Sequence, residues 1–134
     1  MAGKIVADTL EHSTAGSVST QYVVEGSIKA WINFDGSSTG AVGDYDRDSF
    51  NCSVITDHGT GQFSLGFVSN FGNANYAGVG ISGADGTTFS QARSLFINTT
   101  SPTSSTFRIH TKQCDSGGNQ NDPQIHVMVI GDLA

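Results

Sequence analysis

Apolar side chains recur at every second position in several short segments of the chain, with polar side chains between them. Residues 28–34 show the pattern most clearly, because the apolar positions there are Ile28, Ala30, Ile32 and Phe34. A period of two predicts a strand with one buried face. The same pattern predicts further strands over residues 50–54, 62–67, 76–82, 93–99, 106–112 and 124–130.

The connections between these segments predict how the strands pair. Residues 57–61 contain two glycines and are short enough for an antiparallel hairpin between the strands on either side. Residues 115–122 are expected to form a longer hairpin between the last two strands, which would make His110 and His126 cross-strand neighbours. The final strand is apolar on both faces, so we expect it to be central in a sheet or covered by a neighbour.

Composition agrees with an all-β fold. Valine and isoleucine far outnumber leucine, and 17 glycines with only two prolines are typical of many short strands joined by turns. Glycines at 66, 78 and 80 fall within predicted strands and indicate close approach of another chain segment. The predicted fold is an antiparallel β-sandwich, jelly-roll-like, over residues 27–134, preceded by an extended N-terminal arm over residues 1–26.

The arm contains too little apolar surface to be ordered alone. Residues 4–10 are compatible with a short strand, and residues 22–24 form an apolar island. We expect the arm to dock on its own sandwich, on a sister subunit or on a larger assembly. The docking residues would be Val6, Leu10, Tyr22 and Val23.

Charge and motifs exclude several classes of function. The net charge of −6, with six scattered basic residues, disfavours nucleic acid and anionic membranes as partners. No apolar run approaches the ~20 residues that span a bilayer, so membrane insertion is not expected. Hydrolase, Walker and dinucleotide-binding motifs are missing, so the sequence predicts a protein that is not an enzyme.

The long segment 35–48 ends in an acidic run that includes Tyr45. Asp44, Asp46 and Asp48 alternate as in the opening of a calcium loop, but the later glycine and glutamate of such a loop are missing. A solvated acidic loop, partly neutralised by Arg47, is the favoured interpretation. We therefore predict no cofactor, with calcium as the weaker alternative.

Trp31 lies on the polar side of its strand, so it is expected to pack under the arm or to contact a partner such as a subunit or a sugar. The predicted partner contacts are Trp31, Asp44, Tyr45, Asp46, Arg47 and Asp48. The two cysteines, Cys52 and Cys114, are interpreted as buried thiols, since a bridge would need adjacent strands.

Several stretches resemble one known group of proteins. Residues 26–36 read GSIKAWINFDG, residues 48–57 read DSFNCSVITD, and the chain continues with GTGQF at 59–63, NANYA at 73–77 and IHVMVIGD at 125–132. Together with ADTLEHSTAG at 7–16, they resemble a virion structural and tail-fibre-like module of tailed bacteriophages of the marine type. Cys52 stands where that module usually has valine, and His58 where it usually has asparagine.

This resemblance covers nearly the whole chain and implies a trimeric or otherwise symmetric virion appendage that contacts other virion proteins and takes part in host attachment. The protein would be assembled in the host cytoplasm and located on the virion, with a host surface glycan as a further partner. A capsid decoration protein that stabilises the head is the alternative. A glycan-binding lectin or a depolymerase is the less favoured interpretation.

Overall fold

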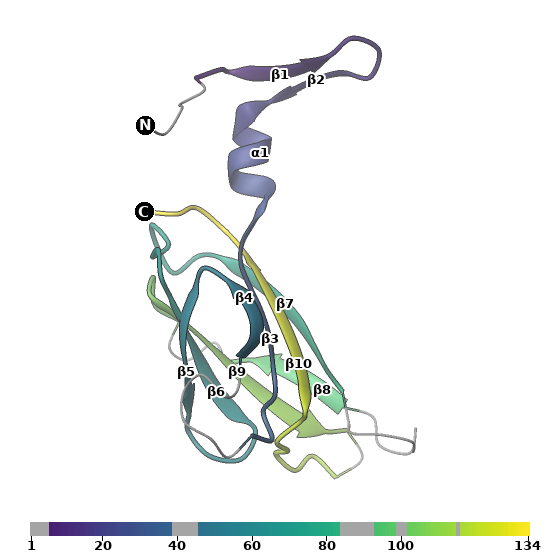
Figure 1. The fold of residues 1–134 in the computed structure, drawn as a ribbon, viewed down its shortest axis with the longest axis vertical. Helices are drawn as coiled ribbons and strands as arrows, with labels where there is room; N and C mark the ends of the chain where they lie inside the picture. Colours follow the sequence, from purple (N-terminus) through teal and green to yellow (C-terminus); the bar gives the residue numbers. More distant parts are fainter. Residues whose placement is uncertain (1–5, 39–45, 84–92, 99–101, 115) are drawn as a thin grey trace.

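The computed structural model describes residues 6–38, 46–83, 93–98, 102–114 and 116–134 (Figure 1). One helix, α1 (Thr20–Gly26), follows the short strands β1 (Thr9–His12) and β2 (Gly16–Ser19). The other strands are β3 (Ile28–Phe34), β4 (Asp46–Phe50), β5 (Cys52–Asp57), β6 (Gln62–Phe67), β7 (Ala77–Gly83), β8 (Arg93–Ile97), β9 (Thr106–Gln113) and β10 (Gln124–Ile130).

Eight of these strands form two four-stranded antiparallel sheets. The order is β4-β3-β10-β7 in the first sheet and β5-β6-β9-β8 in the second, while β1 and β2 pair only with each other. The prediction of an all-β antiparallel fold is confirmed. The finer prediction of a jelly roll is not established by this strand order.

The core lies between the two sheets and is filled from alternate positions of their strands. Ile32 and Phe34 of β3 are buried, as are Phe63 and Leu65 of β6, so the predicted alternation is confirmed in β6 and in β3 from Ala30 onward. It is wrong at the start of β3, where Ile28 is exposed and Lys29 is buried, because the register with β10 shifts there. The rings of Phe34 and Phe63 meet edge to face across the sheets, with centroids 5.3 Å apart. Each fully buried side chain of this size contributes about 1.5–3 kcal/mol of hydrophobic stabilisation.

The predicted strand over residues 50–54 is interrupted, because Asn51 adopts a positive φ of 55°. The side-chain nitrogen Nδ2 of Asn51 donates to the Lys29 and Ser69 carbonyl oxygens, and Asn51 Oδ1 accepts from the Ser69 backbone amide. The chain therefore leaves the first sheet at Phe50 and enters the second at Cys52. This corner also breaks the alternation, because Ile55 is buried whereas the period of two predicted burial of Val54.

Glycines let the sheets approach closely along β7. A Cβ atom at position 78 would collide with the Phe107 ring, and one at position 80 would lie 2.6 Å from the His126 carbonyl oxygen and 3.0 Å from Leu95 Cδ1. The prediction of close approach at these glycines is confirmed. The branched side chains of β7 consequently point outward, to solvent.

The predicted hairpin between β9 and β10 is wrong, because these strands belong to different sheets. The chain instead passes from one sheet to the other between β9 and β10, so His110 and His126 are not cross-strand neighbours. His110 pairs with positions on β6 and β8, and His126 with positions on β3 and β7. The prediction that the last strand is central is confirmed, since β10 lies between β3 and β7.

The N-terminal segment is not extended. It folds into the β1–β2 hairpin and the α1 helix, whose first turn is capped by the Ser19 hydroxyl accepting from the Gln21 amide. Figure 1 shows this hairpin–helix arm, residues 6–26, standing clear of the two sheets and joined to β3 through Ser27. The apolar residues 22–24 lie in the helix.

Both cysteines are free thiols. Cys52 is half-buried on β5, whereas Cys114 is exposed just after β9, so the prediction of two buried thiols is wrong for Cys114. Strand β6 separates β5 from β9, and a Cys52–Cys114 bridge therefore has no adjacent strands on which to form.

Candidate functional site

The outer surface of the first sheet carries a row of large apolar side chains. Strand register places Phe50 of β4 opposite Trp31 of β3, Trp31 opposite Met128 of β10, and Met128 opposite Val79 of β7. Neighbouring strands lie about 4.8 Å apart, so the row crosses the whole sheet. We call this surface the Trp31 face; its apolar members are Ile28, Trp31, Phe50, Val79, Ile81, Met128 and Ile130.

These side chains are exposed to an unusual degree for their size. Val79 retains 61% and Ile81 67% of their surface, and Phe50 retains 55%. Apolar patches of this kind on single chains are often binding surfaces. The hairpin–helix arm stands clear of both sheets, including strand β3, which carries Trp31 (Figure 1).

Charge is nearly missing from the Trp31 face. Among the side chains that the structure describes at its outward positions, Asp48 on the edge strand β4 is the single carboxylate. Sequence reasoning identified Trp31 but missed Phe50, Met128 and Val79. A signal was available in β10, where apolar residues occupy both alternating sets of positions.

The hairpin–helix arm is the second candidate surface. All four predicted docking residues are exposed, from Leu10 and Val23 to Tyr22 at 74% and Val6 at 80%. None of the helix residues is buried. A seven-residue helix and an isolated two-stranded hairpin are each marginal in water, so the apolar side chains of the arm lack the cover that would stabilise it.

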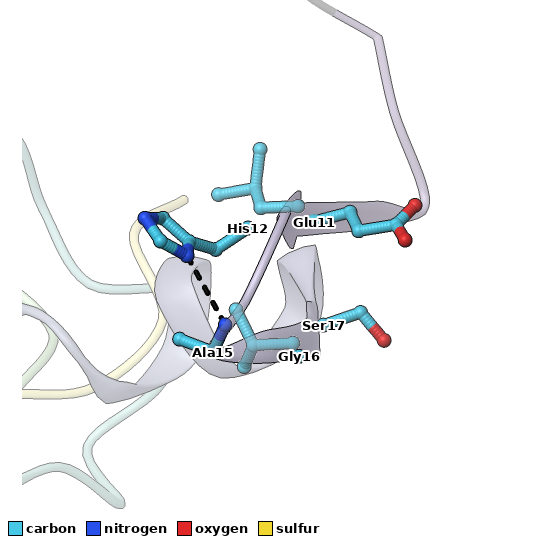
Figure 2. Close-up of a pocket in the computed structure, with 7 residues that line it drawn as sticks. Glu11, His12, Ala15, Gly16 and Ser17 are labelled. Carbon is cyan, nitrogen blue, oxygen red and sulfur yellow. Dashed lines mark hydrogen bonds between the residues drawn. The ribbon is translucent and has the colours of Figure 1, made fainter.

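The hairpin has two chemically different sides. Register places Leu10 opposite Val18 on one side and Glu11 opposite Ser17 on the other. Figure 2 shows the His12 ring turned toward Ala15, whose amide donates to His12 Nδ1 over 3.1 Å, while Glu11 and Ser17 point the other way. Side chains and backbone of the hairpin line a shallow hollow of about 340 Å³.

The described residues include only part of the acidic segment. Asp44 and Tyr45 lie outside the described residues, and Asp46 is described by its backbone alone. Arg47 Nη2 lies 3.0 Å from Asp35 Oδ2, at the start of the same segment.

Asp48 is exposed, and its Oδ1 accepts from the Ser49 amide. Burial tends to raise the pKa of Asp35, but hydrogen bonds from Ser37 and the Arg47 charge hold that pKa below its usual value.

Metal binding finds no support in the described part of the chain. No group of three or more histidine, cysteine, aspartate or glutamate residues there could hold an ion. The calcium prediction at Asp44, Asp46 and Asp48 includes a residue outside the described ranges, and it stays a prediction.

A buried ion pair joins two loops at the end of the sandwich. Arg93 Nε, at the start of β8, lies 3.0 Å from Asp122 Oδ1, just before β10, and the Asp122 side chain has no exposed surface. Burial raises the pKa of Asp122 above its usual value, against the lowering effects of the Ser82 hydroxyl and the Arg93 charge. The sequence holds no signal for this pair, since 29 positions separate its members.

Comparisons with known proteins add no relative. No protein family, no curated protein and no solved structure matches the chain. Within the described residues, no helix is both long and apolar enough to cross a membrane. The candidate surfaces must therefore be interpreted from their own chemistry.

Proposed function

We propose that this chain is a non-enzymatic structural protein of a bacteriophage virion, where it forms part of a symmetric tail-fibre or head-fibre appendage that attaches to the host. The observation that carries the proposal is the hairpin–helix arm, whose apolar side chains are uncovered on an otherwise well-packed sandwich. Such an arm is suited to docking on another component of an assembly. The resemblance of residues 26–36 and 48–57 to phage appendage modules is the reason for proposing a phage virion as that assembly.

The Trp31 face supports a homo-oligomer, which we take to be a trimer. Copies with a net charge of −6 repel one another over most of their surface. The Trp31 face is where they can approach with little charge repulsion, and burying its apolar side chains would supply the driving force. Assembly would take place in the host cytoplasm, before the particle is released.

The test changes the apolar side of the arm and measures incorporation into particles. The variant carries Leu10→Ser, Tyr22→Ser and Val23→Ser in the full chain. A matched control carries Glu11→Gln and Ser17→Ala, on the polar side of the hairpin. We expect the first variant to be lost from purified virions and the control to be retained. Thermal unfolding should show an intact sandwich in both.

Normal incorporation of the serine variant would contradict docking through the arm. The alternative function, decoration and cementing of the capsid, uses the same arm to grip neighbouring head subunits. Imaging intact particles with the protein labelled distinguishes the two, since an appendage is seen at the tail or as a head fibre and a decoration protein covers the head. Labelling elsewhere than on the particle would contradict both functions.

A further inference from the structure

The outer surface of the second sheet differs from the Trp31 face, because it concentrates positive charge. Strand β9 carries Arg108, His110 and Lys112 at alternate positions, on the side opposite the buried Phe107 and Ile109. Alternate side chains on a strand lie about 6.6–6.8 Å apart on one face. We call these three residues the β9 stripe. It contains two of the six basic residues of the chain.

Little negative charge offsets the stripe. The four strands of this sheet contain one acidic residue, Asp57, which ends β5 and accepts the Gly59 amide through its Oδ1. Within the described part of the chain, neither Arg108 nor Lys112 forms an ion pair. Burial, and then the charges of Arg108 and Lys112, lower the pKa of His110 below its usual value. The local potential is therefore positive, although the whole chain is acidic.

The groups beside the stripe are hydroxyls, amides and one aromatic ring. Register places Ser64 opposite Arg108, Ser94 opposite Lys112, and both Gln62 and Phe96 beside His110. The Phe96 ring is 51% exposed, and Lys112 Nζ lies 5.9 Å from its centroid. A sugar ring can stack on such an aromatic face while its hydroxyls bond the neighbouring amides and hydroxyls. Cations beside this platform select sugars that carry acid groups.

We propose that the β9 stripe binds an acidic polysaccharide, with the carboxylate or sulfate groups of the glycan on Arg108 and Lys112 and a sugar ring on Phe96. This inference rests on the proposed role in host attachment and names the chemistry of the attached surface. Acidic residues more than about 8 Å from the stripe oppose binding only weakly, because charges at such distances are largely screened at physiological salt. The stripe and the Trp31 face lie on opposite sheets, so ligand binding and assembly use different surfaces.

The experiment measures binding of the full chain to three immobilised polymers: polygalacturonate, dextran sulfate and neutral dextran. Soluble polyphosphate serves as an anion without sugar rings. The test variants are Arg108→Gln with Lys112→Gln, and Phe96→Ser alone. Lys29→Gln is the control, since it removes one positive charge from the other sheet.

We expect binding to one or both acidic polymers and none to neutral dextran, weakening as salt is raised. The double variant should lose at least about tenfold in affinity, because two charge-assisted contacts are removed. Phe96→Ser should weaken glycan binding but leave polyphosphate binding unchanged, and Lys29→Gln should bind as the parent does. The preference between the two acidic polymers identifies the acid group as carboxylate or sulfate.

Three results would overturn the proposal. The first is no binding to either acidic polymer, and the second is binding that the double variant leaves intact. The third is a change of oligomeric state in the double variant, which would assign the stripe to a contact with an acidic segment of a second copy. Particle incorporation is measured separately, so a stripe variant that enters virions normally but does not bind glycan leaves the proposed structural role standing.

Discussion

Replacing Asp122 with asparagine is the sharpest test of how the loop end of the sandwich is held together. Asp122 is fully buried and lies 3.0 Å from the Arg93 guanidinium. The substitution keeps the shape of the side chain but leaves a cation beside it without its carboxylate. Removing one partner of a buried pair costs about 3–5 kcal/mol, a large part of the 5–15 kcal/mol that stabilises a domain. For a domain of this size we expect the melting temperature to fall by about 10–15 °C.

The paired substitution should behave in the opposite way. Burial raises the pKa of Asp122 in spite of the adjacent Arg93 charge, which indicates that the cost of desolvation outweighs the attraction between the partners. We therefore expect Arg93→Leu with Asp122→Leu to unfold within about 1 kcal/mol of the parent chain, or to be more stable. Chemical denaturation with a double-mutant cycle measures both quantities. If Asp122→Asn costs less than about 1 kcal/mol, the assignment of this pair as a buried, coupled contact is wrong.

Three further predictions concern single positions. Gly78→Val should lower the free energy of unfolding by about 1–3 kcal/mol or more, because the valine side chain would collide with the buried Phe107 ring. Denaturant titration measures this loss, and an unchanged midpoint would contradict the close approach of the sheets. In the folded chain the pKa of His110 lies below its usual value of 6.5, so the unfolded chain binds the His110 proton more tightly. The free energy of unfolding should therefore fall as the pH drops from about 7 to 5. A His110→Gln variant should show a shallower loss over that range, and an identical pH profile would refute the linkage. When the native protein is mixed with a thiol reagent, the exposed Cys114 should react within the mixing time and the half-buried Cys52 much more slowly. Mass spectrometry of the labelled peptides measures both rates, and equal rates would contradict the difference in exposure.

Local pattern was sufficient to predict individual strands. The alternation in residues 28–34 and 62–67 correctly identified β3 and β6 and, from Ala30 onward in β3, their buried positions, because a strand has a period of two whatever it pairs with. The alternation failed at Asn51. A positive φ at a residue other than glycine depends on the Lys29 and Ser69 backbone groups that its side chain bonds, and these lie 22 and 18 positions away.

The candidate surfaces were predicted in part. Trp31 could be identified because it lies on the polar side of its strand. Its companions Phe50, Met128 and Val79 come from three other strands, and only the register between those strands brings them into one row. The β9 stripe is readable as three alternate residues, but the scarcity of carboxylates on the strands around it depends on which strands lie beside β9.

The sequence by itself determined most strands of the two sheets, the buried positions of β6 and of β3 from Ala30 onward, the choice between a central and a covered β10, and the scarcity of charge, all of which follow from neighbours along the chain. The tertiary structure decided that β9 and β10 belong to different sheets, that Arg93 meets Asp122, and that residues 9–26 form a hairpin and a helix clear of the sandwich. Pairing between distant segments depends on how all strands share one core. A two-residue period specifies which side of a strand is buried, but it contains no information about which strand lies next to it.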